Sequence, residues 1–383
     1  MKYRALGNSG LLVSEVGLGC EYFAGKDAAT VNAMMDEAMD RGVNIMDVFM
    51  AQPEIRSNLG EALRGRREKM ILQGHVGSVW ADGQYKCSRD LKECKSAIAD
   101  FLDRFHTDYI DIGMLHYVDE IEEWNTAIQK GIIDYLIAQK KAGVFRAIGV
   151  SSHDPLVSAE MVKSGVIDVL MFSINPLFDL VFNDMERFFT MKDDEAFPET
   201  LDIDPNRAAL YALCAERGVG ITVMKPLAAG CLLTEADSPF GVPLTVAQCI
   251  AYALNRPAVA SVLVGCGSVE QVIEAASFDE LPDEAKTYAD VVARITGSPK
   301  PKCMYCNHCL PCPAGIDIAA VTRILDEARQ TGVTAELRRQ YATLACHGEN
   351  CIDCGQCVAR CPFGIDAQEN MKEIAALSMM TRE

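Results

Sequence analysis

The sequence is poor in basic residues and has no long apolar run. Its 36 Lys and Arg residues are outnumbered by 54 Asp and Glu residues, which gives a formal net charge of -18 at pH 7. Nucleic-acid phosphates and anionic membranes repel such a surface, so neither is expected as a partner. The first residues have no apolar segment behind a basic start, and nowhere do about 18 uncharged apolar residues run together. We therefore expect a soluble, cytoplasmic protein.

Cysteine, by contrast, is abundant. There are 16 cysteines in 383 residues, and in a chain without an export signal they argue against a disulfide framework. Eight of them stand in two runs near the C-terminus, "CMYCNHCLPCP" and "CIDCGQCVARCP". This spacing is typical of metal ligands. The eight candidates are Cys303, Cys306, Cys309, Cys312, Cys351, Cys354, Cys357 and Cys361.

The chain is long enough for a barrel of roughly 250 residues and a second domain. From Leu12 to about Ala276, short β-branched runs alternate with stretches of helical period, which is the pattern of repeated βα units. Gly42, Gly143 and Gly218 stand at helix ends that favour a left-handed residue. Eight strands are expected, the first near Val16 and the others ending at Asp47, Gly74, His116, Ser152, Asn175, Lys225 and Cys266.

Eight parallel strands alternating with helices are the number that closes a barrel. We therefore predict an α/β fold with a (β/α)8 TIM barrel over residues 1–285, a linker over 286–302 and a small helical ferredoxin-like iron-sulfur domain over 303–383. In that last domain, two helices are expected between Ile316 and Thr343, and Cys346 lies outside both cysteine runs.

Polar residues gather at the carboxyl ends of the expected strands, where the catalytic face of such a barrel is built. A single histidine there is more often structural than catalytic, but the convergence of several polar groups favours a functional site. The residues are Asp47, His75, His116, Ser151, Ser152, His153, Asn175 and Lys225.

The second cysteine run has the CxxCxxCxxxCP spacing of bacterial-type ferredoxins, in which the last cysteine binds the other cluster. This spacing predicts crossed ligation of two [4Fe-4S] clusters. Cys361 would bind the same cluster as the first three cysteines of the first run, and Cys312 the same cluster as the first three cysteines of the second run. The first run has two residues rather than three before its last cysteine, so ligation within each run is the alternative. Zinc is a further alternative, although zinc sites usually use two separated pairs.

In the same order along the chain, "YRALGNSGLLVSEVGLG", "GVNIMD", "DYIDIGMLH", "GVFRAIGVSSHD", "GVGITVMKPLAAG" and "SVLVGCGSVEQ" resemble the aldo-keto reductase family. With "CMYCNHCLPCPAGIDI" and "CIDCGQCVARCPFGI", the chain is similar to the subgroup that carries a C-terminal ferredoxin-type domain. The resemblance implies a (β/α)8 barrel that binds NADP(H) and reduces aldehydes or ketones with an Asp, Tyr, Lys and His tetrad.

Two members of that tetrad are matched. Asp47 and His116 occupy the positions of the family's aspartate and histidine, whereas Gln52 stands where the tyrosine is expected and His75 where the lysine is expected. The resemblance therefore predicts that Asp47 orients His75 and that His116 polarises the substrate oxygen. The proton is then handled by a histidine or by a loop tyrosine, for which Tyr22, Tyr85 and Tyr117 are candidates.

The resemblance also implies cofactor contacts. Ser151 and Ser152 would bind the nicotinamide carboxamide, with Asn175 beneath the ring, and the loop from Lys225 would follow the pyrophosphate. The other residues that the resemblance implies for cofactor binding are Lys225, Pro226, Leu227, Gly230, Gly265, Ser268 and Gln271. Because no arginine stands where relatives grip the 2′-phosphate, NAD(H) or a flavin remain alternatives to NADP(H).

Three functions fit these observations. The first is an iron-sulfur oxidoreductase that acts on a small carbonyl or hydroxyl compound and exchanges electrons with a ferredoxin or flavodoxin. The second is an isomerase or lyase that uses an Asp47–His75 dyad, with structural or regulatory clusters. The third is an electron-transfer subunit without chemistry in the barrel.

Overall fold

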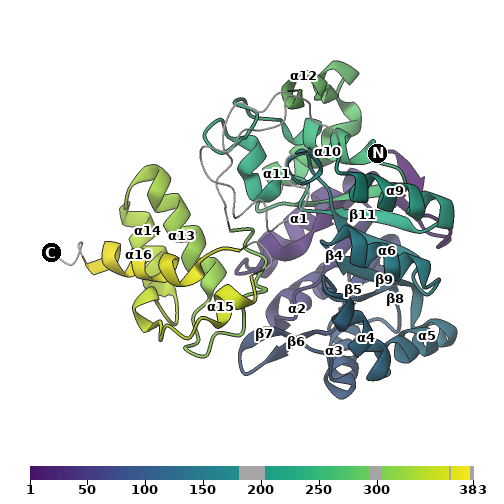
Figure 1. The fold of residues 1–383 in the computed structure, drawn as a ribbon, viewed down its shortest axis with the longest axis horizontal. Coiled ribbons are helices and arrows are strands. Elements are labelled where there is room, and N and C mark those ends of the chain that lie inside the picture. The colour runs from purple at the N-terminus through teal and green to yellow at the C-terminus, as the bar shows by residue number, and fades with distance from the viewer. Residues whose placement is uncertain (181–202, 294–302, 362–363, 380–383) are drawn as a thin grey trace. The chain divides into compact units, whose positions relative to one another are not determined.

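The computed structural model describes residues 1–180, 203–293, 303–361 and 364–379. Eight parallel strands form a closed barrel, as the alternating pattern predicts (Figure 1). Each strand lies within a few residues of its expected position. The strands are β3 (Val16–Gly19), β4 (Ile45–Val48), β5 (Ile71–Val76), β8 (Ile110–Leu115), β9 (Phe145–Ser152), β10 (Val169–Ser173), β11 (Gly220–Met224) and β12 (Val259–Gly265).

Helices follow the strands and surround them (Figure 1). Asp27, Asp90, Asp154 and Asp204 each cap a helix by accepting hydrogen bonds from the first backbone N–H groups. The main helices of the barrel are α1 (Ala28–Asp40), α2 (Pro53–Ala62), α3 (Leu91–Arg104), α4 (Ile121–Gln129), α5 (Ile132–Ala142), α6 (Pro155–Lys163), α9 (Pro205–Arg217), α10 (Val246–Leu254) and α11 (Val269–Ala276). Shorter helices are α7 (Pro176–Leu180) and α12 (Ala289–Val292).

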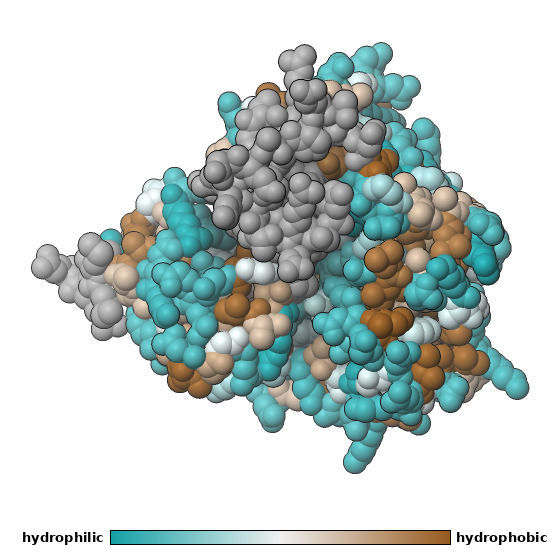
Figure 2. All heavy atoms as spheres, viewed as in Figure 1, coloured by the Kyte–Doolittle hydropathy of each residue, from teal (hydrophilic) through white to brown (hydrophobic). Residues whose placement is uncertain are grey.

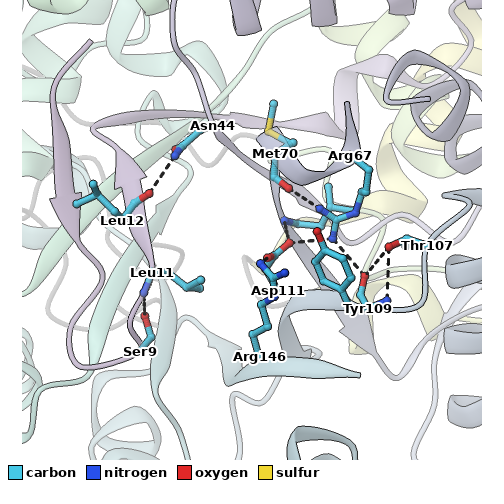
Figure 3. Close-up of polar contacts among 11 residues, drawn as sticks. Ser9, Leu11, Leu12, Asn44, Arg67, Met70, Thr107, Tyr109, Asp111 and Arg146 are labelled. Atoms are coloured by element: carbon cyan, nitrogen blue, oxygen red, sulfur yellow. Dashed lines mark hydrogen bonds and ion pairs between the residues drawn. The ribbon is translucent and has the colours of Figure 1, made fainter. Parts of the chain in front are cut away.

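The amino-terminal end of the barrel is closed by an antiparallel hairpin of β1 (Tyr3–Ala5) and β2 (Leu12–Ser14). Leu6 and Val13 of this segment are fully buried and pack with Ile45 and Val169 in the barrel interior. The Asn44 amide donates to the Leu12 carbonyl over 2.9 Å and fixes the hairpin to the start of β4 (Figure 3). Apolar side chains therefore fill the barrel at this end, and the polar residues of the expected site lie at the opposite end, where the strands have their carboxyl ends.

A buried carboxylate ties the amino-terminal ends of neighbouring strands together (Figure 3). Asp111 on β8 accepts hydrogen bonds from the guanidinium groups of Arg67 and Arg146, both over 2.8 Å, and from the backbone N–H of Leu72 on β5 over 3.0 Å. The two guanidinium groups also lie against the Tyr109 ring, at 4.3 and 4.0 Å from its centroid. This network fixes β5 against β8, the strands that carry His75 and precede His116.

The chain divides into two compact units, and the second contains the cysteine-rich tail. Its helices are α13 (Ile318–Thr331), α14 (Ala335–Thr343), α15 (Gln356–Ala359) and α16 (Ala367–Met379), so the two helices expected before Thr343 are present. Arg329 of α13 forms ion pairs with Asp326 and with Glu373 of α16, and it donates to Asn370. The turn between β6 (Ser78–Ala81) and β7 (Gln84–Cys87) also belongs to this unit.

The expected domain boundaries at 285 and 303 stay predictions. Tyr288, beyond the first of them, packs its ring 5.2 Å from that of Tyr252 in the barrel unit, while residues 294–302 of the expected linker lie outside the described residues. On the face shown in Figure 2, hydrophilic side chains cover most of the surface and hydrophobic ones form smaller groups. Within the described ranges, no helix is both long and apolar enough to cross a membrane.

Candidate active site and cluster-binding cysteines

Three of the predicted catalytic residues form one hydrogen-bonded row at the carboxyl ends of β4, β5 and β8. His75 Nε2 lies 2.8 Å from Asp47 Oδ1, and His75 Nδ1 lies 2.8 Å from Nδ1 of His116. All three side chains are almost fully buried. Asp47 and His75 therefore have the dyad geometry that the sequence predicts, and His116 extends it into a relay.

Two residues that the sequence reasoning missed support this relay. Gln73 donates from its amide to Asp47 Oδ1 over 3.0 Å, and the Phe49 ring stacks on His116 with an interplanar angle of 7° and a centroid distance of 5.9 Å. Gln73 precedes His75 by two residues on β5, so strand alternation alone places both side chains on the same side of the sheet. Phe49, just after β4, offered no comparable signal.

A second polar cluster lies at the ends of β9 and β11. His153 donates from its backbone N–H to Asp119 Oδ1 over 2.6 Å, and its Nδ1 lies 2.9 Å from Asp119 Oδ2. On the other side of the ring, Nε2 lies 2.9 Å from the Lys225 ammonium. Burial lowers the pKa of His153, and the Lys225 charge adds to this against the opposing effect of Asp119.

The three candidate tyrosines lie in different places. Tyr117 follows His116 directly, and its ring lies 6.3 Å from the His116 ring and 5.9 Å from the His153 ring. The Tyr22 ring covers the backbone of Gly265, where an added Cβ would come within 2.6 Å of it. Tyr85 is buried within β7. Tyr117 is therefore a candidate tyrosine that lies beside His116.

The residues expected at the nicotinamide make hydrogen bonds within the protein. Ser151 Oγ accepts from the Tyr117 N–H over 2.8 Å, and a serine hydroxyl can still donate its own hydrogen. Ser152 Oγ donates to Asp119 and accepts from the Asp154 N–H. Asn175 donates to the Lys225 carbonyl and accepts from the Phe178 N–H, so it joins the ends of β10 and β11.

The remaining expected cofactor residues lie in the turn after β11 and at the start of α11. Pro226 is buried, Leu227 packs on the core, and Gly230 is left-handed with φ 86°. Ser268 caps α11 by accepting from the Gln271 N–H, and Gln271 accepts in return from the Gly267 N–H over 2.6 Å. A helix amino terminus of this kind favours anionic groups, which is consistent with a phosphate-binding role.

The two cysteine runs have left-handed residues at matching positions. Left-handed residues stand two and four positions after the first cysteine of each run, namely Tyr305 and Asn307 in one, and Asp353 and Gly355 in the other. Three positions after each last cysteine comes a left-handed glycine, Gly315 or Gly364, whose N–H donates to the carbonyl of Cys312 or Cys361. An aspartate then caps α13 and α16 in turn. The tail is therefore built from two similar halves.

Thiol groups from the two runs are neighbours in space. A cavity is lined by four cysteines of the expected second set, Cys312, Cys351, Cys354 and Cys357, and by Cys309. Burial raises the pKa of Cys303, and the nearby thiols of Cys306 and Cys361 raise it further. The pKa of Cys357 is likewise raised by burial and by the nearby thiols of Cys351 and Cys312. Thiols from both runs therefore lie close to one another, and the crossed arrangement stays a prediction.

Throughout the described ranges, no group of three or more His, Cys, Asp or Glu side chains is arranged to hold a single metal ion. A tetrahedral zinc site needs four donors around one ion, whereas the thiolates of a [4Fe-4S] cluster each bind a different iron and stand farther apart.

A closed eight-stranded parallel barrel with a buried hydrogen-bonded row at the carboxyl ends of its strands has the architecture of the α/β-barrel enzymes. The chain belongs to the aldo/keto reductase family, whose model matches residues 15–245. The cysteine runs lie outside this match. Membership makes the protein an oxidoreductase and does not favour the isomerase, lyase or electron-transfer alternatives.

Individual relatives agree with this assignment. The uncharacterized oxidoreductase YqkF of Bacillus subtilis is 29% identical over 325 residues, which cover 74% of this chain and 94% of the relative. The L-galactose dehydrogenase of Arabidopsis thaliana is 26% identical over 319 residues, which cover 72% of this chain and 86% of the relative. Among solved structures, the aldo-keto reductase AKR11C1 from Bacillus halodurans superimposes with a TM-score of 0.59 at 27% identity, covering 78% of this chain and 98% of that one.

Proposed function

We propose that the protein is an iron-sulfur oxidoreductase of aldo-keto reductase type that acts on a small carbonyl or hydroxyl compound with NADP(H) and two [4Fe-4S] clusters. In place of the family's tyrosine and lysine, Asp47, His75 and His116 move the proton. The observation that carries this proposal is the unbroken row of hydrogen bonds among these three buried side chains.

The row fixes which nitrogen carries a proton. A carboxylate can only accept, so His75 donates to Asp47 from Nε2. If His75 is neutral, its Nδ1 accepts, and His116 must donate from its own Nδ1. His116 then has a lone pair on Nε2, through which it can accept a proton from a substrate hydroxyl. In this state the relay is a general base.

One additional proton reverses the roles. With His75 doubly protonated, both of its nitrogens donate, so His116 accepts at Nδ1 and carries its hydrogen on Nε2. The Nε2 proton of His116 can pass to a carbonyl oxygen while the Nδ1 proton of His75 passes to His116 Nδ1, so that both rings end neutral. The buried Asp47 carboxylate stabilises the positive charge on His75 while the proton is stored. The same relay therefore serves reduction when protonated and oxidation when deprotonated.

Some of the residues near the relay are suited to bind a nicotinamide cofactor, and others hold the loops around them. The Ser151 hydroxyl can donate to a carboxamide, while Ser152 and Asn175 hold the surrounding loops in place. The turn around Gly230 and the amino terminus of α11 would take the pyrophosphate and adenosine end. When bound, the nicotinamide supplies or accepts the hydride. Specificity for NADP(H) over NAD(H) stays a prediction.

The cysteine-rich unit fits two clusters. Cys303, Cys306, Cys309 and Cys361 would bind one, and Cys312, Cys351, Cys354 and Cys357 the other, in keeping with the thiol neighbourhoods described above. The Tyr305 N–H lies 3.4 Å from the Cys303 sulfur, and N–H groups of this kind raise cluster potentials by stabilising added negative charge. When bound, the clusters transfer single electrons. A ferredoxin or flavodoxin is the corresponding partner.

The relay is tested by NADPH-dependent reduction of a panel of small aldehydes and ketones with the anaerobically purified full-length protein. His75→Phe and His116→Phe remove the proton path while keeping a ring in place, so we expect kcat/KM to fall by about 10²- to 10⁴-fold, the usual contribution of acid-base catalysis. His106→Gln is the matched control, because His106 is an exposed histidine paired with Glu61. Near-normal turnover in both Phe variants would refute a catalytic relay.

A further inference from the structure

Gln84, at the start of β7, is bound to one of the expected cluster cysteines through both ends of its side-chain amide. Its Oε1 accepts from the Cys312 N–H over 2.8 Å, and its Nε2 donates to the Cys312 carbonyl over 3.1 Å. We propose that Gln84 is a positioning residue, which holds Cys312 in place to bind the cluster that it shares with Cys351, Cys354 and Cys357. This inference rests on the proposed function, and on crossed ligation in particular.

A tight turn holds the backbone of Gln84. Asp82 and Gly83 have positive φ angles of 52° and 76°, as a type I′ turn requires, and Asp-Gly is a sequence that favours this turn. The turn joins β6 and β7, which pair as a two-stranded sheet. Residues 81–86 belong to the same compact unit as Cys312, so the two amide bonds lie within that unit. Gln84 is therefore presented to Cys312 by a fixed backbone.

The N–H of Cys312 is bound differently from that of its counterpart in the second run. The Cys361 N–H donates to the Val358 carbonyl over 3.1 Å, three residues back in its own run. The first run has one residue fewer at this point, and Cys312 stands between two prolines, which have no N–H. Its own N–H is thus the backbone donor of this short stretch, and it donates to Gln84. Gln84 therefore supplies from another segment a contact that the longer run makes within itself.

The residues just before Cys312 are held from the second run. Arg360 donates to the Pro311 carbonyl over 2.7 Å and to the Cys309 carbonyl over 3.4 Å. Cys312 itself lines a cavity together with three cysteines of the second run. Arg360 and Gln84 thus fix this segment from two directions. Because a ligand that is already held loses less conformational freedom when it binds, Cys312 is prepared to bind its cluster.

The test measures the release of iron from the anaerobically reconstituted full-length protein to an excess of an Fe²⁺ chelator. Gln84→Leu removes both amide bonds. Gln84→Glu keeps the size and the acceptor, but it replaces the donor by a carboxylate oxygen that faces the Cys312 carbonyl. The matched control is Gln340→Leu, which changes an exposed glutamine of α14 in the same unit, paired with Glu336. Thermal unfolding of each variant is followed in parallel.

Electron paramagnetic resonance spectra of the dithionite-reduced proteins identify the cluster that responds. Cys351→Ser changes a ligand of the cluster that Cys312 is expected to share, and Cys303→Ser changes a ligand of the other cluster. The signals that each serine variant alters are then compared with those that Gln84→Leu alters.

We expect Gln84→Leu and Gln84→Glu to release about half of the iron faster, by about 10- to 100-fold, the usual effect on metal binding of removing a group that orients a metal ligand. The other half should leave at the wild-type rate, and Gln340→Leu should change neither half. The altered spectral signals should be those that Cys351→Ser also alters.

Three results overturn the proposal. The first is wild-type iron release in both Gln84 variants, and the second is equal acceleration of both halves of the iron. The third is a change in the signals that Cys303→Ser alters instead. A lower midpoint of thermal unfolding with unchanged iron release would make Gln84 a structural contact only.

Failure of the proposed function would look different. A wild-type protein that holds no iron after reconstitution contradicts the clusters themselves, and the role of Gln84 is overturned with them. A wild-type protein that holds about eight irons, but whose iron release does not respond to the Gln84 variants, keeps the two clusters and overturns the positioning role alone.

Discussion

Replacing Asp111 by Ala should destabilise the barrel strongly, because one buried carboxylate serves three donors. Its side chain is only 2% exposed, and it accepts from Arg67, from Arg146 and from the Leu72 N–H. Arg67 is 11% exposed and would be left without this partner in a buried setting, whereas Arg146 is 50% exposed and can turn to water. Breaking one side of a buried ion pair costs about 3–5 kcal/mol.

For a domain of this size, such a loss lowers the midpoint of thermal unfolding by on the order of 10 °C. The assay is thermal or urea unfolding of the anaerobically purified full-length protein, followed by circular dichroism. Arg146→Ala is the matched control. It removes an exposed partner of the same carboxylate and should cost about 1 kcal/mol or less. A loss below about 1 kcal/mol in Asp111→Ala would refute the reasoning, since the guanidinium and the Leu72 N–H would then have found other partners.

The remaining predictions concern protons and clusters. The lowered pKa of His153 means that the unfolded chain binds its proton more readily, so stability should be lost as pH falls below about 6.5. This loss should be smaller in His153→Asn, as followed by urea unfolding between pH 5 and 8. Cys312→Ser should change the iron content and the electron paramagnetic resonance spectrum, whereas Cys346→Ser, outside both runs, should leave both as in the wild type.

The barrel could be predicted from the sequence because its signals are local. Apolar runs of strand length followed by helical periods recur eight times, and glycines stand at three of the expected helix ends. Gly143 and Gly218 are indeed the left-handed caps of α5 and α9. The positions of Asp47 and His116 at strand ends followed from the same alternation.

The hydrogen bonds of the relay could not be predicted from the sequence alone. Sequence placed His75 beside Asp47 through the resemblance, but the bond between the two Nδ1 atoms of His75 and His116 depends on the register of β5 and β8, in which His75 pairs with Met114. Asp119, in a loop, gave no periodic signal, so its link to His153 and Lys225 was not foreseen. Such contacts depend on tertiary packing, which a local sequence pattern does not predict.

In the cysteine tail, spacing alone left crossed and local ligation open. The structure adds that Cys312 lines the same cavity as Cys351, Cys354 and Cys357. This arrangement depends on how the two cysteine runs and the helices that follow them, α13 and α16, pack together. The number of residues between the two runs does not determine that packing.

The most direct test of the account is the iron and acid-labile sulfide content of the anaerobically purified full-length protein. Two [4Fe-4S] clusters predict about eight irons and eight sulfides for each chain, and no zinc. Zinc bound in place of iron, or iron that stays near four per chain after reconstitution, would contradict an oxidoreductase in which this barrel works with two clusters.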